Sequence, residues 1–219
     1  MSRTDARTGQ AFRGSQKWLQ RFVAEYPEAL VPKGLLAFDW KSPVAQARYG
    51  EYQDAAFLHA LDYARLAPQL AQFWPNGGPV WDGLALSGTS PVLIEAKAHT
   101  REFLTTPSKA SEPSLARIRT SLAAVKAALG VDERSDWTRC YYQYANRLAH
   151  VWWFHQHGIE AHLVMVNFLG CSEMSGPTSK ETWHAAEEAA DYALGLAKRH
   201  ALSKFVHHIH PDIRVLKAH

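Results

Sequence analysis

Two apolar, strand-like segments of this sequence contain charged residues whose presence needs an explanation. Asp82 lies in the first segment, and Glu95 and Lys97 lie near the end of the second. Residues 87–90 join the segments and are rich in turn formers, so the two segments are predicted to form an antiparallel hairpin. Counting back from this connection pairs Asp82 with Glu95. Because side chains alternate along a strand, both carboxylates and Lys97 are expected on one face of the sheet.

Opposed carboxylates repel each other, which favours a cation or a proton between them. A hard divalent cation such as Mg²⁺, or Mn²⁺ in its place, takes oxygen ligands and keeps several water molecules. Asp82, Glu95 and the backbone carbonyl of Ala96 would supply such ligands. Lys97 would then contact the attacking water or a scissile phosphate, and His99 continues the same face toward that phosphate. These residues are suited to the hydrolysis of a phosphodiester.

The same residues allow a simpler interpretation. Asp82, Glu95 and Lys97 could form a partly exposed network of ion pairs at a sheet edge, because short patterns of this kind often arise by chance. The spacing gives both interpretations similar weight. A rival metal site would use the histidine-rich stretch HHIHPD, residues 207–212, but its spacing matches no familiar zinc motif, and we interpret these residues as surface or packing residues.

The elements around the hairpin predict an α/β domain. Apolar residues at helical spacing, with capping and breaking residues at the ends, predict helices over residues 18–26, 43–66, 114–129, 137–157 and 178–197. Apolar runs predict strands over residues 80–86, 91–98, 163–169 and 205–209. The order of these elements predicts a small mixed sheet, a hairpin plus buried strands, sandwiched by helices.

The composition is that of a folded domain, since 219 residues with 47% hydrophobic residues can bury a core. We expect a flexible N-terminal arm over residues 1–15 and a single domain over residues 16–219. The net charge of +3, from 24 basic and 21 acidic residues, permits a polyanionic partner without requiring one. The two cysteines, Cys140 and Cys171, are expected to be small buried residues. Few cysteines and no apolar run of about 18 residues predict a cytoplasmic protein with no membrane contact.

A resemblance to a known family follows from these residues. Asp82, then Glu95, Ala96 and Lys97 at the end of an apolar strand, with a helix before them and helices and a buried strand after, resembles the PD-(D/E)XK nuclease superfamily. The stretches GPVWDGLAL, LIEAKAH and YYQYANRLAH also resemble a group of bacterial proteins with that core, from about residue 16 onward. Trp81 stands where the proline of the superfamily pattern would precede Asp82.

The resemblance implies a restriction-endonuclease-like fold and a metal-dependent deoxyribonuclease. It implies that Asp82 and Glu95 are metal ligands and that Lys97 is the catalytic lysine. Many relatives carry a further glutamate on the helix before the sheet. Glu51 is the candidate for this additional ligand, with Asp54 one turn later as a substitute, and a solvated helix face is the alternative for Glu51.

The helix predicted after the hairpin supplies further candidates. Some exonuclease-like relatives have a glutamine there, and Gln143 resembles it as a catalytic residue. Gln143, Arg147 and His150 share one helix face, which would point into a cleft. We expect Arg147, together with Arg101 and His99, to contact DNA. Ordinary surface polarity is the alternative interpretation.

A non-catalytic hypothesis stands beside the nuclease. The chain could keep the nuclease fold as a nucleic-acid-binding or assembly protein. Removal of Mg²⁺ separates the two hypotheses, because a binder would be indifferent to the loss whereas a nuclease would stop cleaving. Cleavage of both strands of DNA would favour a homodimer.

Overall fold

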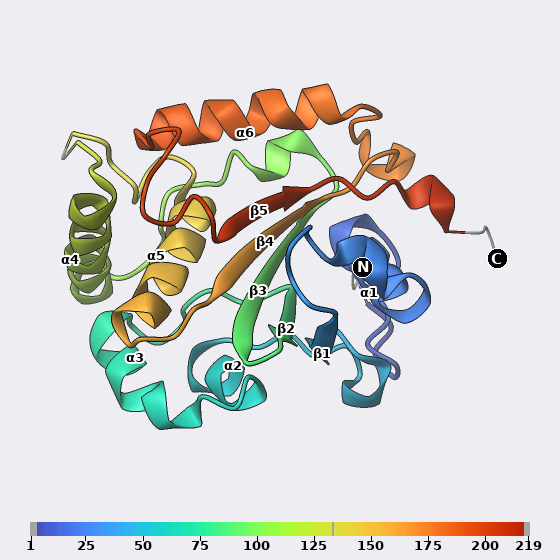
Figure 1. The fold of residues 1–219 in the computed structure, drawn as a ribbon, viewed down its shortest axis with the longest axis horizontal. Helices are drawn as coiled ribbons and strands as arrows, with labels where there is room; N and C mark the ends of the chain where they lie inside the picture. The colour runs from blue at the N-terminus through green and yellow to red at the C-terminus, as the bar shows by residue number, and fades with distance from the viewer. Residues whose placement is uncertain (1–3, 133, 217–219) are drawn as a thin grey trace.

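A five-stranded mixed sheet forms the centre of the α/β fold in the computed structural model, which describes residues 4–132 and 134–216 (Figure 1). The strands are β1 (Phe38–Ser42), β2 (Gly83–Ser87), β3 (Ser90–Lys97), β4 (His162–Asn167) and β5 (Val206–Ile209). They lie in the order β1-β2-β3-β4-β5. β1, β2 and β3 pair antiparallel, whereas β3, β4 and β5 pair parallel. β3 is therefore the middle strand, and its carboxyl end lies at the same edge as those of β4 and β5.

Helices cover both faces of this sheet (Figure 1). They are α1 (Gly14–Glu25), α2 (Asp54–Ala60), α3 (Ala67–Phe73), α4 (Glu112–Leu129), α5 (Tyr142–Gln156) and α6 (Lys180–Leu194). None of the helices in the described part of the chain is long and apolar enough to cross a membrane. The predicted α/β class, with a small mixed sheet between helices, is confirmed.

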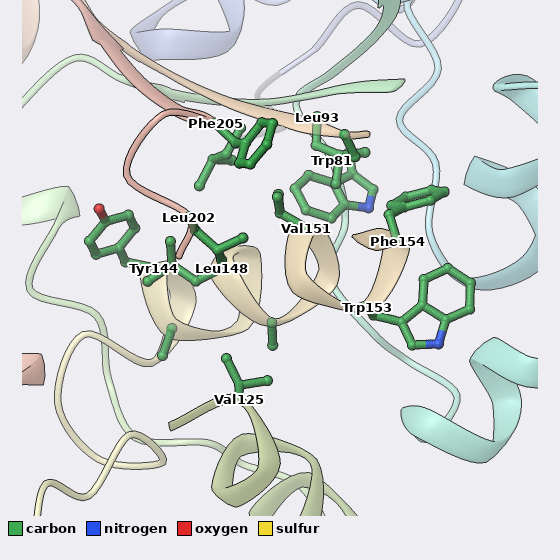
Figure 2. Close-up of a cluster of buried hydrophobic side chains, with 14 of the residues drawn as sticks. Trp81, Leu93, Val125, Tyr144, Leu148, Val151, Trp153, Phe154, Leu202 and Phe205 are labelled. Atoms are coloured by element: carbon green, nitrogen blue, oxygen red, sulfur yellow. The ribbon is translucent and has the colours of Figure 1, made fainter. Parts of the chain in front are cut away.

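The core has two parts, one on each face of the sheet. On one face, Ile94 of β3 packs in a cluster with Phe22 of α1. On the other face, Leu93 packs in a larger cluster with residues of α5, which lies between the sheet and Val125 of α4 (Figure 2). Every residue of β4 is buried, which confirms the prediction of a strand covered on both sides.

The hairpin and several later elements are confirmed. Leu86 pairs with Pro91 and Leu84 with Leu93, the register obtained by counting back from the connection. α4, α6, β4 and β5 lie close to their predicted positions. α6 ends at Leu194 rather than Ala197, because Gly195 adopts a left-handed conformation that terminates the helix.

Other expectations were wrong. The segment predicted as one helix over residues 43–66 contains short 3₁₀ turns and the short helix α2, and it is preceded by the unpredicted edge strand β1. β1 is mostly half-exposed, so it lacks the strong apolar pattern of an inner strand. α5 begins at Tyr142 rather than at residue 137, after Tyr141 in a left-handed conformation. Cys171 is buried as expected, but Cys140 is exposed.

The N-terminal segment has contacts within its described part. Thr4 forms a β-bridge with Ala11, whose amide donates to the Gln20 side chain at 2.8 Å. The guanidinium of Arg48 donates to the carbonyl of Ala6 at 2.6 Å. α1 then begins at Gly14, close to the expected start of the domain.

Candidate active site

Asp82 contacts the middle strand β3 through its side chain, and not as the paired strand residue that was predicted. The last strand pair is Gly83 with Ile94, so Asp82 lies in a bend before β2 and is not a strand partner of Glu95. Its carboxylate accepts a hydrogen bond from the backbone amide of Ala96 at 2.8 Å. Because the amide and carbonyl of a strand residue point to the same edge, the carbonyl of Ala96 also faces this side.

The bend also decides the orientation of Trp81. Strand alternation would place Trp81 on the face of Ala85, but Trp81 packs in the core cluster on the α5 face (Figure 2). Trp81 pairs with Tyr52 in an isolated β-bridge, and the regular pleat of β2 begins only at Gly83. The alternation rule holds only where the strand is continuous.

Charged groups contact each other at the end of β3. Glu95 pairs with Lys97 through one carboxylate oxygen and with Arg147 of α5 through the other, at 2.6 Å from Nη2 and 2.7 Å from Nε. Lys97 also donates to the amide oxygen of Gln143 at 2.6 Å. Glu95, Lys97 and Arg147 are 1%, 6% and 3% exposed. The alternative of a partly exposed network at a sheet edge is therefore wrong, although the ion pairs themselves are real.

The two carboxylates differ in their protonation. Burial, with the nearby charge of Glu95, raises the pKa of Asp82 to about 8 despite Lys97 and the Ala96 amide. Burial also acts to raise the pKa of Glu95, but Arg147 and Lys97 hold it below its ordinary value. At neutral pH one acid of the pair is neutral and the other ionised. This relieves the repulsion that opposed carboxylates would otherwise suffer.

A polar cavity of about 930 Å³ opens above these groups. Asp82, Glu95, Lys97 and Gln143 line it, and it is bordered by the start of α1, the loop 77–80 and the loop 104–109. Arg13, Arg101 and Lys109 add positive charge to its wall, where Glu102 is the one further carboxylate among the lining residues, so the wall is cationic on balance. Its size is that of a typical ligand site, and its cationic wall suits an anionic ligand.

The acidic candidates before the sheet occupy different positions. Glu51 lies in an extended segment, because α2 begins only at Asp54, so it is not the predicted helical residue. Its carboxylate accepts from Gln16 at 2.6 Å. Packing around this carboxylate and the charge of Glu95 raise its pKa, so Glu51 shares the electrostatic field of the site. Asp54 accepts from the amides of Gly77 and Gly78 at 3.0 and 2.9 Å and shapes the loop beside the cavity.

The face of α5 is only partly as expected. Gln143 and Arg147 line the cavity, but His150 is 1% exposed and packs among aromatic rings that include Trp74 and Trp81. Burial lowers the pKa of His150 to about 4, so this histidine is neutral. The prediction that His150 points into a cleft is wrong, because the aromatic core closes over it.

The residues predicted to contact nucleic acid lie in different places. Arg147 is buried against Glu95 and donates to the carbonyl of Val80 at 2.8 Å, but it also lines the cavity, so its contact with DNA stays a prediction. His99 follows the end of β3, and its Nδ1 accepts from the Arg101 amide at 2.8 Å. His99 lines a smaller neighbouring pocket and not the cavity, and its contact with DNA stays a prediction. Arg101 lines both pockets.

Sequence reasoning missed the true role of Arg147 and the contribution of the loop 104–109. Arg147 and Glu95 are 52 positions apart, and no local spacing connects them. The amide of Gln143 donates to the Thr105 hydroxyl at 3.1 Å, which ties this loop to the start of α5. The polarity of the loop, which ends at Lys109, was its only signal in the sequence.

Comparison of the chain with protein-family models, with curated proteins and with solved structures gives no match, so its function must be inferred from the site itself.

Proposed function

We propose that this protein is a divalent-metal-dependent nuclease of the PD-(D/E)XK type, with a restriction-endonuclease-like core, that hydrolyses DNA phosphodiester bonds. One observation carries the proposal: Asp82, Glu95 and Lys97 meet at the end of the middle strand, on the floor of a cavity with a cationic wall. A buried ion-pair network costs desolvation free energy and is a weak way to stabilise a fold. Its position at the floor of a cavity favours a chemical role.

The donor atoms fit a hard cation such as Mg²⁺ or Mn²⁺. Asp82 is a buried acid whose pKa is raised to about 8, so it holds a proton that a bound cation would replace. Glu95 and the carbonyl of Ala96 would complete the protein ligands, and Glu51 lies within electrostatic reach of Glu95. When bound, the ion would polarise the phosphate and lower the pKa of a water molecule.

The residues of the chain have separate tasks in this proposal. Gln143 holds the Lys97 ammonium at the cavity floor, where its charge stabilises a phosphate as negative charge develops. Arg147 keeps Glu95 ionised and holds it by a hydrogen bond from Nε and an ion pair from Nη2, so it is a positioning residue. Arg13, Arg101 and Lys109 attract the phosphates of the substrate toward the cavity.

The test is cleavage of circular and linear DNA with Mg²⁺, Mn²⁺ or a chelator. Wild-type protein is compared with Asp82→Ala, Lys97→Ala and Glu28→Ala, the last an exposed carboxylate that does not line the cavity. We expect cleavage only with metal, lost in the first two variants and kept in the third. Cleavage that survives both Asp82→Ala and Lys97→Ala would contradict the proposal.

One observation favours a second candidate, a DNA-binding protein without turnover. Both oxygens of Glu95 are occupied by protein cations, Lys97 and Arg147, which compete with a metal ion for that carboxylate. Such a protein would bind DNA equally well with chelator and would cleave none of it. Electrophoretic mobility shifts in chelator, beside the cleavage assay, separate the two functions.

A further inference from the structure

A second polar cluster lies between α6 and the end of β5. His184 and Glu187 belong to α6, and His210 follows β5 directly. Their ligand atoms all lie within 4.8 Å of one another, and among the described residues no other group of three His, Cys, Asp or Glu side chains does so. We propose that His184, Glu187 and His210 bind one zinc ion.

Local structure explains how the cluster forms. His184 and Glu187 are three positions apart on a helix, so they share one face. α6 runs along the β5 side of the sheet (Figure 1). His210 then meets that helix face, with its Nε2 at 2.8 Å from a Glu187 oxygen and its ring centroid 4.9 Å from that of His184. Two elements distant in sequence thus supply the three donors.

The burial of these side chains suits a metal site with one open position. Glu187 is 8% exposed and the His210 side chain 7%, while His184 is exposed. Ligand atoms around a tetrahedral zinc ion are roughly 3.3 Å apart, given bonds of about 2.0–2.1 Å. The ligand atoms, now within 4.8 Å of one another, would approach that spacing on binding. The exposed side leaves a fourth position for water or an anion.

Polar groups crowd one oxygen of Glu187. The Asn167 amide donates to this oxygen at 2.6 Å, and His208 Nδ1 lies 3.3 Å from it. The buried Oδ1 of Asn167 has no hydrogen-bond partner among the described residues. A buried unpaired atom is rare and calls for an unseen partner, such as a water molecule or an ion.

The donor set selects the kind of metal. Two imidazoles and one carboxylate suit zinc and similar transition metals, whereas Mg²⁺ prefers oxygen ligands alone. The hydrogen bond from Asn167, which is fully buried, fixes the orientation of the Glu187 carboxylate, as outer partners of metal ligands do. The ion would join α6 to the end of β5. This inference does not depend on the proposed nuclease.

The experiment measures zinc directly. Protein stripped with chelator is incubated with Zn²⁺, freed of unbound metal by gel filtration and analysed for bound zinc, and Co²⁺ is used as a spectroscopic substitute. The variants are His184→Ala and Glu187→Gln. His59→Ala, an exposed histidine on α2, is the matched control. Asp82→Ala removes any contribution from the cavity.

We expect one zinc per chain in wild type, His59→Ala and Asp82→Ala, and the visible absorption of four-coordinate Co²⁺. His184→Ala and Glu187→Gln should weaken zinc binding by at least about ten-fold. His184 is exposed, so loss of binding in His184→Ala would not reflect a failure to fold. Wild type that retains no zinc, or variants that bind zinc as tightly as wild type, would overturn the proposal.

Discussion

Two polar clusters lie near the carboxyl ends of the parallel strands, and they solve the problem of buried charge differently. At β3, the Glu95 carboxylate is balanced by the protein cations Lys97 and Arg147, and Asp82 by a raised pKa. Between α6 and β5, Glu187 is surrounded by imidazoles, which carry no obligatory charge. The charges of the first cluster are therefore balanced within the protein, whereas the second cluster has two largely buried members and one exposed histidine, His184.

This difference has a consequence for metal binding. A cation at the first cluster must displace a proton from Asp82 and compete with Lys97 and Arg147 for Glu95, which favours weak, exchangeable binding. A cation at the second cluster meets imidazole and carboxylate donors already close together. We therefore expect an exchangeable hard ion at the first site and a retained zinc ion at the second.

The largest effect is expected from removing the ammonium at the cavity floor. Lys97→Ala should lower the rate of DNA cleavage by about 10²–10³-fold, because a preorganised charge near the reacting phosphate is lost. The initial rate of nicking of circular DNA with Mg²⁺ measures this, with His59→Ala as the control. An unchanged rate in Lys97→Ala would show that the Lys97 charge has no part in cleavage, and would contradict a catalytic role for the first cluster.

Loss of a compensating cation should destabilise the first cluster strongly. Arg147→Met leaves Glu95 with one partner fewer in the interior and should lower the free energy of unfolding by about 3–5 kcal/mol. Arg134→Ala, which breaks an exposed ion pair with Asp132, should lower the free energy of unfolding far less, because solvent screens that pair. Urea unfolding of both variants is the measurement. A double variant, Arg147→Met with Glu95→Gln, should recover part of the loss.

The pH dependence of stability distinguishes a core histidine from those near Glu187. Burial lowers the pKa of His150 from 6.5 to about 4, so the unfolded chain binds the proton more readily. The stability that this difference contributes is complete above about pH 6.5 and is lost as the pH falls toward 4. The loss amounts to about 3 kcal/mol, at 1.36 kcal/mol per pKa unit.

Replacement of this histidine tests that assignment. His150→Leu should flatten the dependence of the unfolding free energy on pH between about pH 4 and 6.5. His59→Ala, which removes an exposed histidine, should leave the slope as in wild type. Equal slopes in His150→Leu and wild type would show that His150 is not the neutral core residue described above.

Zinc should stabilise the folded chain through the second cluster only. At about 100 times its dissociation constant, zinc adds about 2.7 kcal/mol to the free energy of unfolding. Thermal unfolding should therefore shift upward in wild type and Asp82→Ala, and should not shift in His184→Ala. A zinc shift lost in Asp82→Ala and kept in His184→Ala would place the ion at the first cluster instead.

The predictable parts of this fold are those whose signals are local. A short turn and alternating apolar residues predicted the pairing of Leu84 with Leu93, because the two strands are joined directly. α4 was predicted from apolar spacing and from Gly130, which ends it in a left-handed conformation. β1 was missed because an edge strand with half-exposed residues carries little periodic signal.

The same distinction applies to the candidate sites. Glu95 and Lys97 were found because alternation along β3 places them on one face, and Asp82 was found because it lies directly before the paired strand β2. The pairing of Arg147 with Glu95 and the grouping of Glu187 with His210 depend on how a helix docks on the sheet. The way a helix docks depends on the burial of apolar surface over the whole core. A short stretch of sequence does not indicate it.

Local chemistry in the chain was thus sufficient for the hairpin, the main helices and the acidic residues with their lysine. The packed structure alone decided that Trp81 turns toward α5, that His150 is a core residue, and that Arg147 neutralises Glu95. The physical reason is the range of the forces: backbone hydrogen bonding and turn geometry act between neighbours in sequence, whereas burial and charge compensation act between neighbours in space.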